Sequence, residues 1–209
     1  MTKLEINDKV YNLPSSWDEL TLEQYCKAFY NLDTSDKGDE IENLKRDRLN
    51  ESYILSRLLG ESDDFCINLP ITVYEKLVKS IRFMFNIKHL MENARADIKI
   101  DGKIYMIPPF NEMPLRQYID SDVVARQKDN PYSYIELLAI LLTPKDDKGK
   151  WIPYDGKYEE RFETLKKMSC SEALGIVYHY FKKKESSMML SKLYMKEVER
   201  LQHLSTQGS

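Results

Sequence analysis

Leu4-Glu-Ile-Asn-Asp-Lys-Val-Tyr-Asn-Leu-Pro14 and Ile98-Lys-Ile-Asp-Gly-Lys-Ile-Tyr-Met-Ile-Pro108 are two versions of one pattern. In both copies apolar and polar residues alternate around a turn, Asn7-Asp8 in the first and Asp101-Gly102 in the second. Such alternation around a turn pair predicts a β-hairpin. Because proline has no N–H to continue a ladder, each hairpin is expected to end there.

The similarity continues into a second segment, Trp17-Asp-Glu-Leu-Thr-Leu-Glu-Gln-Tyr25 in the first half and Phe110-Asn-Glu-Met-Pro-Leu-Arg-Gln-Tyr118 in the second. A repeat kept at this level describes a structural unit and not a catalytic centre. The matched structural residues are Tyr11, Pro14, Trp17, Gln24 and Tyr25 in the first copy, and Tyr105, Pro108, Phe110, Gln117 and Tyr118 in the second.

Helix signals follow the first hairpin. Thr21-Leu-Glu-Gln24 reads as a capping box, in which Thr caps the helix and Gln reaches back. A second helix is expected over 41–59, with Gly60 as its C-cap. It carries Ile41, Leu44, Leu55 and Leu58 on or near one face. A third helix, opened by a capping box at Thr72-Val-Tyr-Glu75, is expected to reach about residue 93.

The second half shows the same plan. Pro114 replaces the capping Thr, and Asn130-Pro131 predicts the start of the next helix, which Pro144 stops. A helix over about 158–168 follows. Ser169-Cys-Ser-Glu172 then reads as a further capping box that opens another helix.

We therefore expect a mainly α fold with short β-hairpins, an α+β class, in two pseudo-repeated halves. Each hairpin is followed by about three helices. The first repeat covers 1–96, the second covers 97–184 with an insertion at 145–158, and a C-terminal amphipathic helix and tail cover 185–209. No Gly/Ser/Pro-rich linker separates the halves, so we expect them to pack closely, either as two domains or as one.

Composition excludes some function classes. The chain has 209 residues, with 42% hydrophobic residues, 31% charged residues and a net charge of −3. A dedicated DNA-binding protein is usually basic, so specific nucleic-acid binding is not expected. No apolar run approaches the roughly 18 residues of a membrane span, so no membrane partner is expected. The three cysteines, Cys26, Cys66 and Cys170, are widely spaced and form no disulfide framework.

Motifs for catalysis are weak. The histidines have no metal-binding spacing, and the chain has neither a phosphate-binding loop nor a nucleophile elbow. Asp120-Ser-Asp122 is a DxD motif, but Mg²⁺ needs further ligands, and a solvated turn is the simpler interpretation. We therefore expect no enzyme, no catalytic residue, no metal and no cofactor. A metal-dependent enzyme that uses Asp120 and Asp122 remains the less favoured alternative.

Two segments outside the repeat are candidates for protein interaction, since aromatic and methionine side chains suit protein interfaces. The first, in the insertion, comprises Trp151, Tyr154 and Tyr158. The second, in the C-terminal segment, comprises Met188, Met189, Leu190, Leu193, Tyr194 and Leu201.

The order of several motifs resembles that of small proteins from the structural module of tailed bacteriophages, including crAss-like phages. Besides the two hairpin segments, the resemblance rests on Leu55-Ser-Arg-Leu-Leu-Gly60, Ala139-Ile-Leu-Leu-Thr-Pro144, Tyr154-Asp-Gly-Lys-Tyr-Glu-Glu-Arg161 and Met168-Ser-Cys-Ser-Glu-Ala-Leu-Gly175. It covers most of residues 4–182. The hairpin-then-helix opening is also similar to phage tail assembly chaperones.

The resemblance implies a non-enzymatic structural protein of the virion, in the head-to-tail neck or the tail. Such a protein is made in the host bacterial cytoplasm and contacts other phage structural proteins, and its copies form a ring or line a barrel. The alternative is a tail assembly chaperone that is absent from the mature virion. The resemblance supplies no catalytic residue.

Overall fold

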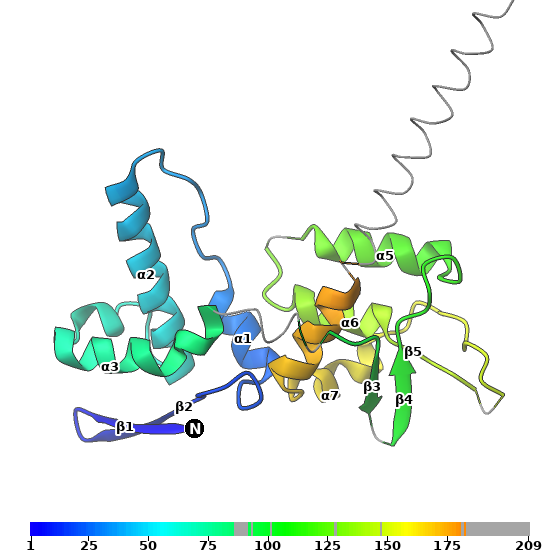
Figure 1. Cartoon of the computed structure of the whole chain (residues 1–209), viewed down its shortest axis with the longest axis horizontal. Coiled ribbons are helices and arrows are strands. Elements are labelled where there is room, and N and C mark those ends of the chain that lie inside the picture. Colours follow the sequence, from blue (N-terminus) through cyan, green and yellow to red (C-terminus); the bar gives the residue numbers. More distant parts are fainter. Residues whose placement is uncertain are drawn as a thin grey trace, which may run out of the picture.

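A computed structural model gives the arrangement of the chain (Figure 1). It describes residues 1–85, 92, 94–100, 102–127, 129–146, 148–180 and 182. Helices dominate, together with two small antiparallel sheets, so the predicted α+β class with short hairpins is confirmed. The predicted C-terminal helix and tail over 185–209 lie outside the described residues.

In the first half, the elements are β1 (Thr2–Ile6), β2 (Lys9–Leu13), α1 (Leu22–Phe29), α2 (Glu40–Leu59) and α3 (Ile71–Ile81), with 3₁₀ turns at Cys66–Asn68 and Arg82–Phe85. In the second half, they are β3 (Asp97–Ile100), β4 (Lys103–Met106), α5 (Leu115–Ala125), α6 (Ser133–Leu141), β5 (Thr143–Pro144), a 3₁₀ turn at Glu159–Arg161 and α7 (Phe162–Lys166). Residues 170–180 form a further helix.

Both hairpins form where the alternating pattern predicts them. Asn7 and Asp8 have φ angles of 51° and 63°, the left-handed backbone of a type I′ turn, which suits the twist of antiparallel strands. In the second hairpin Gly102 has a φ of 82°. The structure adds a strand that the sequence pattern does not reveal, because β5 pairs with β4 through Met106 and Thr143.

Three predicted helix caps are present, at Thr21, Gly60 and Ser169. Thr21 accepts the Gln24 N–H at 3.2 Å, and the Gln24 side chain accepts the Thr21 N–H at 3.0 Å, which confirms the first capping box. Gly60 ends α2 in the left-handed conformation, as predicted. At the Ser169 box, the Glu172 N–H donates to the Ser169 hydroxyl at a longer 3.4 Å.

Two predicted helix starts are wrong. α3 begins at Ile71 directly after Pro70 and has no side-chain cap, so Thr72 lies within the first turn. α6 begins at Ser133, because the Asn130 side chain accepts the Tyr132 N–H at 2.9 Å and turns the chain before the helix. The predicted helix over 158–168 is shorter, being divided between the 3₁₀ turn and α7.

The start of α1 and the start of the helix 170–180 lie side by side. Thr21 and Ser169 form an antiparallel bridge. The Cys170 N–H donates to the Leu20 carbonyl, and the Leu22 N–H donates to the Met168 carbonyl, both at 2.8 Å. Backbone pairing therefore joins the two halves at the point where two helices begin.

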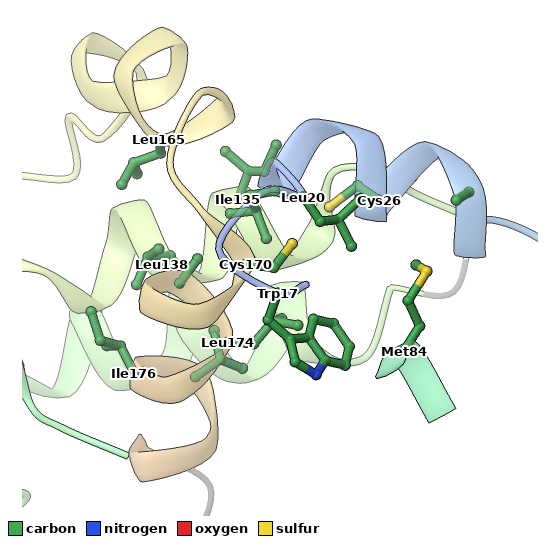
Figure 2. Packing of buried hydrophobic residues seen from close by; sticks show 14 of the residues in the cluster. Trp17, Leu20, Cys26, Met84, Ile135, Leu138, Leu165, Cys170, Leu174 and Ile176 are labelled. Atoms are coloured by element: carbon green, nitrogen blue, oxygen red, sulfur yellow. The ribbon is translucent and has the colours of Figure 1, made fainter. Parts of the chain in front are cut away.

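The hydrophobic core surrounds this junction and contains residues from both halves (Figure 2). Leu20, Ile135, Leu165 and Cys170 are fully buried, and Trp17 is 4% exposed. Burial in these apolar surroundings raises the pKa of the Cys170 thiol, so that the thiol stays protonated and packs as a small apolar group. The core therefore depends on both halves being present.

Replacing Leu20 by Ala tests this dependence. The variant is expected to lose about 2–5 kcal/mol of unfolding free energy, because it leaves a cavity in a shared core. Urea unfolding, followed by circular dichroism and by the fluorescence of Trp17 and Trp151, should show one transition at lower urea. Leu115→Ala is the matched control, since Leu115 is 72% exposed and its truncation should change stability by less than about 0.5 kcal/mol. Separate transitions for the two probes would contradict a shared core.

A candidate protein-docking groove

A groove of about 930 Å³ lies between α2 and α3, next to the 3₁₀ turn that connects them. Its lining is mainly apolar. Leu44 and Leu49 of α2 contribute one wall, and Ile71, Tyr74 and Val78 of α3 contribute the other. A concave apolar surface of this size between two helices is typical of sites that receive a helix or another apolar ligand.

The groove exists because α2 extends past the core. The C-terminal half of this helix is anchored by Ile54 and Leu55, which are 2% and 0% exposed. Ile41 and Leu44, on the N-terminal half, are 65% and 58% exposed. Figure 1 shows this half of α2 projecting beyond α3. The apolar face predicted for this helix is therefore buried at Leu55 and exposed at Ile41 and Leu44.

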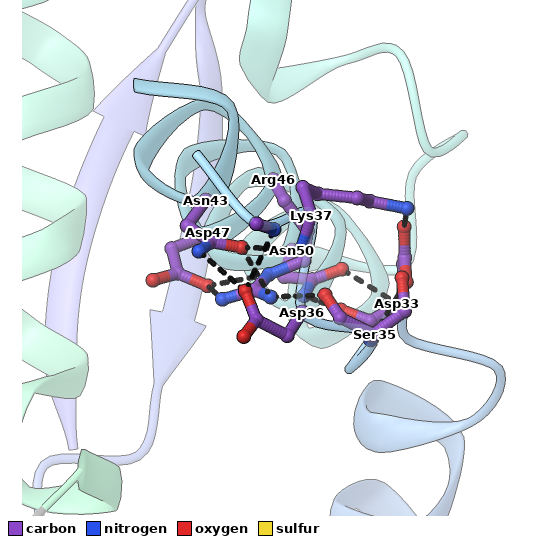
Figure 3. Close-up of polar contacts among 9 residues, drawn as sticks. Asp33, Ser35, Asp36, Lys37, Asn43, Arg46, Asp47 and Asn50 are labelled. Carbon is purple, nitrogen blue, oxygen red and sulfur yellow. Dashed lines mark hydrogen bonds and ion pairs between the residues drawn. The ribbon is translucent and has the colours of Figure 1, made fainter. Parts of the chain in front are cut away.

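Polar contacts hold the projecting half of α2 (Figure 3). Asn50 donates to the Asp33 carbonyl at 2.7 Å, and Asn43 donates to the Asp36 carboxylate at 2.8 Å. Arg46 donates to the Asn43 side chain at 2.9 Å. The hydrogen bond from Asn43, together with one from the Gly38 N–H and the nearby charge of Arg46, lowers the pKa of Asp36. The loop over 30–39 thus fixes the outer wall of the groove through polar contacts.

The two edges of the groove differ in charge. On the α2 edge, Lys45 pairs with Glu42 at 2.6 Å and Arg48 pairs with Glu51 at 2.8 Å. On the α3 edge, the exposed residues Glu75, Lys79 and Arg82 have no ion pair within the part of the chain that the structure describes. The α3 edge therefore presents one negative and two positive charges to a ligand.

The floor of the groove contains a buried hydroxyl. Ser52 is 3% exposed, and its Oγ has no hydrogen-bond partner among the described residues. Nearby, the Tyr74 hydroxyl donates to Glu51 at 2.8 Å and ties α3 to α2. Desolvation, followed by this hydrogen bond, raises the pKa of Tyr74. Leaving a buried hydroxyl without a partner costs free energy, and a ligand in the groove could hydrogen-bond to it.

A second exposed apolar surface lies on α5. Leu115, Ile119 and Val123, four residues apart, are 72%, 48% and 52% exposed and form a stripe along one side of the helix. Arg116 and Asp120 flank the stripe, and their side chains are 3.9 Å apart. We call these three apolar residues the α5 stripe. A helix that leaves such a stripe uncovered is typical of an interaction surface.

The predicted interaction residues of the insertion contact their own chain. The Trp151 Nε1–H donates to Glu112 at 2.6 Å, and the Tyr154 hydroxyl donates to Asp120 at 3.0 Å. Tyr158 is half-buried against the core. A small cleft of about 240 Å³ includes Tyr154 in its lining. Their role in partner binding stays a prediction.

The predicted C-terminal interaction residues, Met188, Met189, Leu190, Leu193, Tyr194 and Leu201, lie outside the described residues.

The matched repeat residues occupy similar places in the chain but different environments. Trp17 is 4% exposed, whereas its counterpart Phe110 is 41% exposed. Gln24 caps α1, whereas Gln117 is fully buried and donates to the Ile140 carbonyl at 2.7 Å. The local order of elements is thus shared, while burial differs between the copies.

One ring contact is common to both copies. Tyr25 meets Trp17 with ring centroids 6.0 Å apart, and Tyr118 meets Phe110 with centroids 5.4 Å apart, while Tyr25 in addition stacks on Phe29. Tyr11 is buried and its counterpart Tyr105 is half-buried, whereas Pro14 and Pro108 are both buried.

The DxD carboxylates have separate partners. Asp122 pairs with Arg126 at 2.7 Å, and Asp120 accepts the Tyr154 hydroxyl. Among the described residues no group of three potential metal ligands occurs. Within the same residues, none of the helices combines the length and the apolar character that crossing a membrane requires.

A scan against protein-family models and searches of curated proteins and of solved structures found no match for this chain.

Replacing Ser52 by Ala should raise the unfolding free energy by up to about 1 kcal/mol, because it removes a buried hydroxyl that lacks a partner. Ser56→Ala is the matched control on the same helix. The Ser56 hydroxyl accepts the Cys66 N–H at 3.1 Å and donates to the Asp63 carbonyl at 3.2 Å, so its loss should cost about 1–3 kcal/mol. Urea unfolding measures both. Destabilisation by both variants would show that Ser52 has a structural partner.

Replacing Asn43 by Ala should loosen the outer wall of the groove. The change removes hydrogen bonds to Asp36 and Arg46. Hydrogen exchange at neutral pH should become severalfold faster over 40–49 and stay unchanged over 52–59, where α2 is anchored in the core. Lys45→Ala is the control, because Lys45 forms an exposed surface pair with Glu42. Equal protection in Asn43→Ala and the unaltered chain would contradict this role for the loop.

Proposed function

We propose that this chain is a non-enzymatic structural protein in the neck or tail of a tailed bacteriophage, present in several copies and acting through protein–protein contacts. The observation that carries the proposal is the α2–α3 groove. It is apolar, open to solvent and charged at its edges. Grooves of this kind bind amphipathic helices, in which apolar side chains enter the groove and charged ones meet the rim.

The occupant proposed for the groove is a helix of a virion protein, either of another kind or of a further copy. The polar loop that fixes the α2 wall supports this proposal, because a preformed wall reduces the ordering cost of binding. The assignment to a phage particle rests on the resemblance of the motif order. An acidic net charge of −3 also suits a protein near a channel through which DNA slides.

Quantitative mass spectrometry of purified phage particles tests this function. We expect several copies of the chain in each particle. We also expect Leu49→Glu, which places a charge in the groove, to reduce incorporation at least tenfold at equal expression. Lys76→Glu is the matched control, since Lys76 is exposed on α3 outside the groove lining.

Two outcomes would contradict the proposal. If the chain is abundant in infected cells and absent from mature particles, the alternative function, a tail assembly chaperone, is correct instead. If Leu49→Glu is incorporated as well as the control, the groove does not carry the contact.

A further inference from the structure

We infer that the α5 stripe of one copy docks in the α2–α3 groove of the next copy, so that identical chains join head to tail. This inference rests on the proposed multi-copy role and specifies its contact. The occupant is a second copy of this chain, because α5 matches the groove in apolar spacing and in the order of its charges.

The apolar match concerns length and spacing. An α-helix rises 1.5 Å per residue, so the α5 stripe from Leu115 to Val123 spans about 12 Å. The α3 wall of the groove, from Ile71 to Arg82, spans about 16 Å on the same basis. Leu115, Ile119 and Val123 therefore fit within the groove as anchors from successive turns.

The charge match concerns order. Along the exposed α3 edge, Glu75 precedes Lys79 by four residues. Along the flank of the α5 stripe, Arg116 precedes Asp120 by four residues, with the opposite signs. If the two helices run parallel, Glu75 faces Arg116 and Lys79 faces Asp120. The reverse direction places like charges together, so the charges select one polarity of docking.

Glu75, Lys79 and Arg116 are exposed and available for such a pairing, whereas Asp120 also accepts the Tyr154 hydroxyl at 3.0 Å and would keep this hydrogen bond while it faces Lys79. The Arg116 side chain is 69% exposed, and its contact with Asp120 within the same helix is loose at 3.9 Å. An exposed pair of this kind contributes little to stability, so replacing it by pairs with another copy costs little free energy. On the opposite side of the groove, Lys45 and Arg48 of the α2 edge are paired with Glu42 and Glu51, so their charges are balanced within the same helix.

The position of the two surfaces favours contact between copies. Figure 1 places α5 in the lobe opposite to the one that contains α2 and α3. A contact that joins two different surfaces of identical chains is heterologous. It continues from copy to copy and closes into a ring when the rotation between neighbours allows closure.

The test is the self-association of the full chain, measured by analytical ultracentrifugation over a concentration series. Leu49→Glu disables the groove and Ile119→Glu disables the α5 stripe, and each variant alone should associate at least tenfold more weakly. An equimolar mixture of the two should form a 1:1 dimer, because one intact stripe meets one intact groove. Circular dichroism and urea unfolding check that both variants fold.

Charge exchange tests the polarity. Glu75→Arg and Arg116→Glu should each weaken association severalfold, and the double variant should recover most of the loss. Lys76→Glu is the control of equal charge change outside the groove and should associate normally. Failure of the double variant to recover would overturn the parallel pairing.

Other outcomes overturn the inference as a whole. A chain that stays monomeric at its highest soluble concentration lacks this contact. A mixture of the two apolar-site variants that stays monomeric excludes a heterologous joint. Association lost in Ile119→Glu and kept in Leu49→Glu shows a two-fold contact between stripes. Any of these results, combined with several copies in purified particles, leaves the proposed function intact and removes only the head-to-tail contact.

Discussion

The antiparallel bridge between Thr21 and Ser169 joins the two halves of the chain at the centre of the core. Two helices begin there, and the first N–H groups of a helix have no partner within it. Capping by the Thr21 and Ser169 side chains meets part of this need, and the bridge supplies backbone carbonyls at Leu20 and Met168. With these polar groups satisfied, the adjoining residues can be buried at the centre of the shared core.

The position of the bridge also explains why α2 and α5 keep solvent-exposed apolar surface. The shared core lies around the bridge, so elements that extend away from it keep uncovered faces. Among the described residues, α2 contributes to the hydrophobic core only through its C-terminal half, and α5 buries Gln117 and Ser121 while Leu115 stays exposed. The Ser121 hydroxyl meets the Tyr180 hydroxyl at 2.9 Å, which fixes the inner side of α5 against the helix 170–180. The groove and the α5 stripe are thus formed by those parts of α2 and α5 that do not pack against the core.

The sequence predicted features that depend on neighbouring residues and missed those that depend on distant ones. The hairpin turn at Asn7-Asp8, the Thr21 box and the Gly60 cap follow from local chemistry. The strand β5 forms by pairing with β4, which is distant in sequence, so no local sequence pattern predicts β5. Likewise, Leu22 is fully buried and its counterpart Leu115 is exposed, although the segments around them match. The groove escaped prediction for this reason, because Leu44 and Leu49 read as ordinary helix residues until the position of α3 is known.

The bridge also has a consequence for how the chain acquires its structure. Thr21 and Cys170, which meet there, are 149 residues apart. Closing so long a loop is entropically costly and slows folding relative to local contacts. On the ribosome, the first hairpin and α1 emerge long before their partners around Ser169. Trp17 and Leu20 therefore stay exposed to solvent during most of translation. Completion of the core is therefore a late event, and truncated chains that end before residue 169 are expected to expose the apolar residues that the finished fold buries.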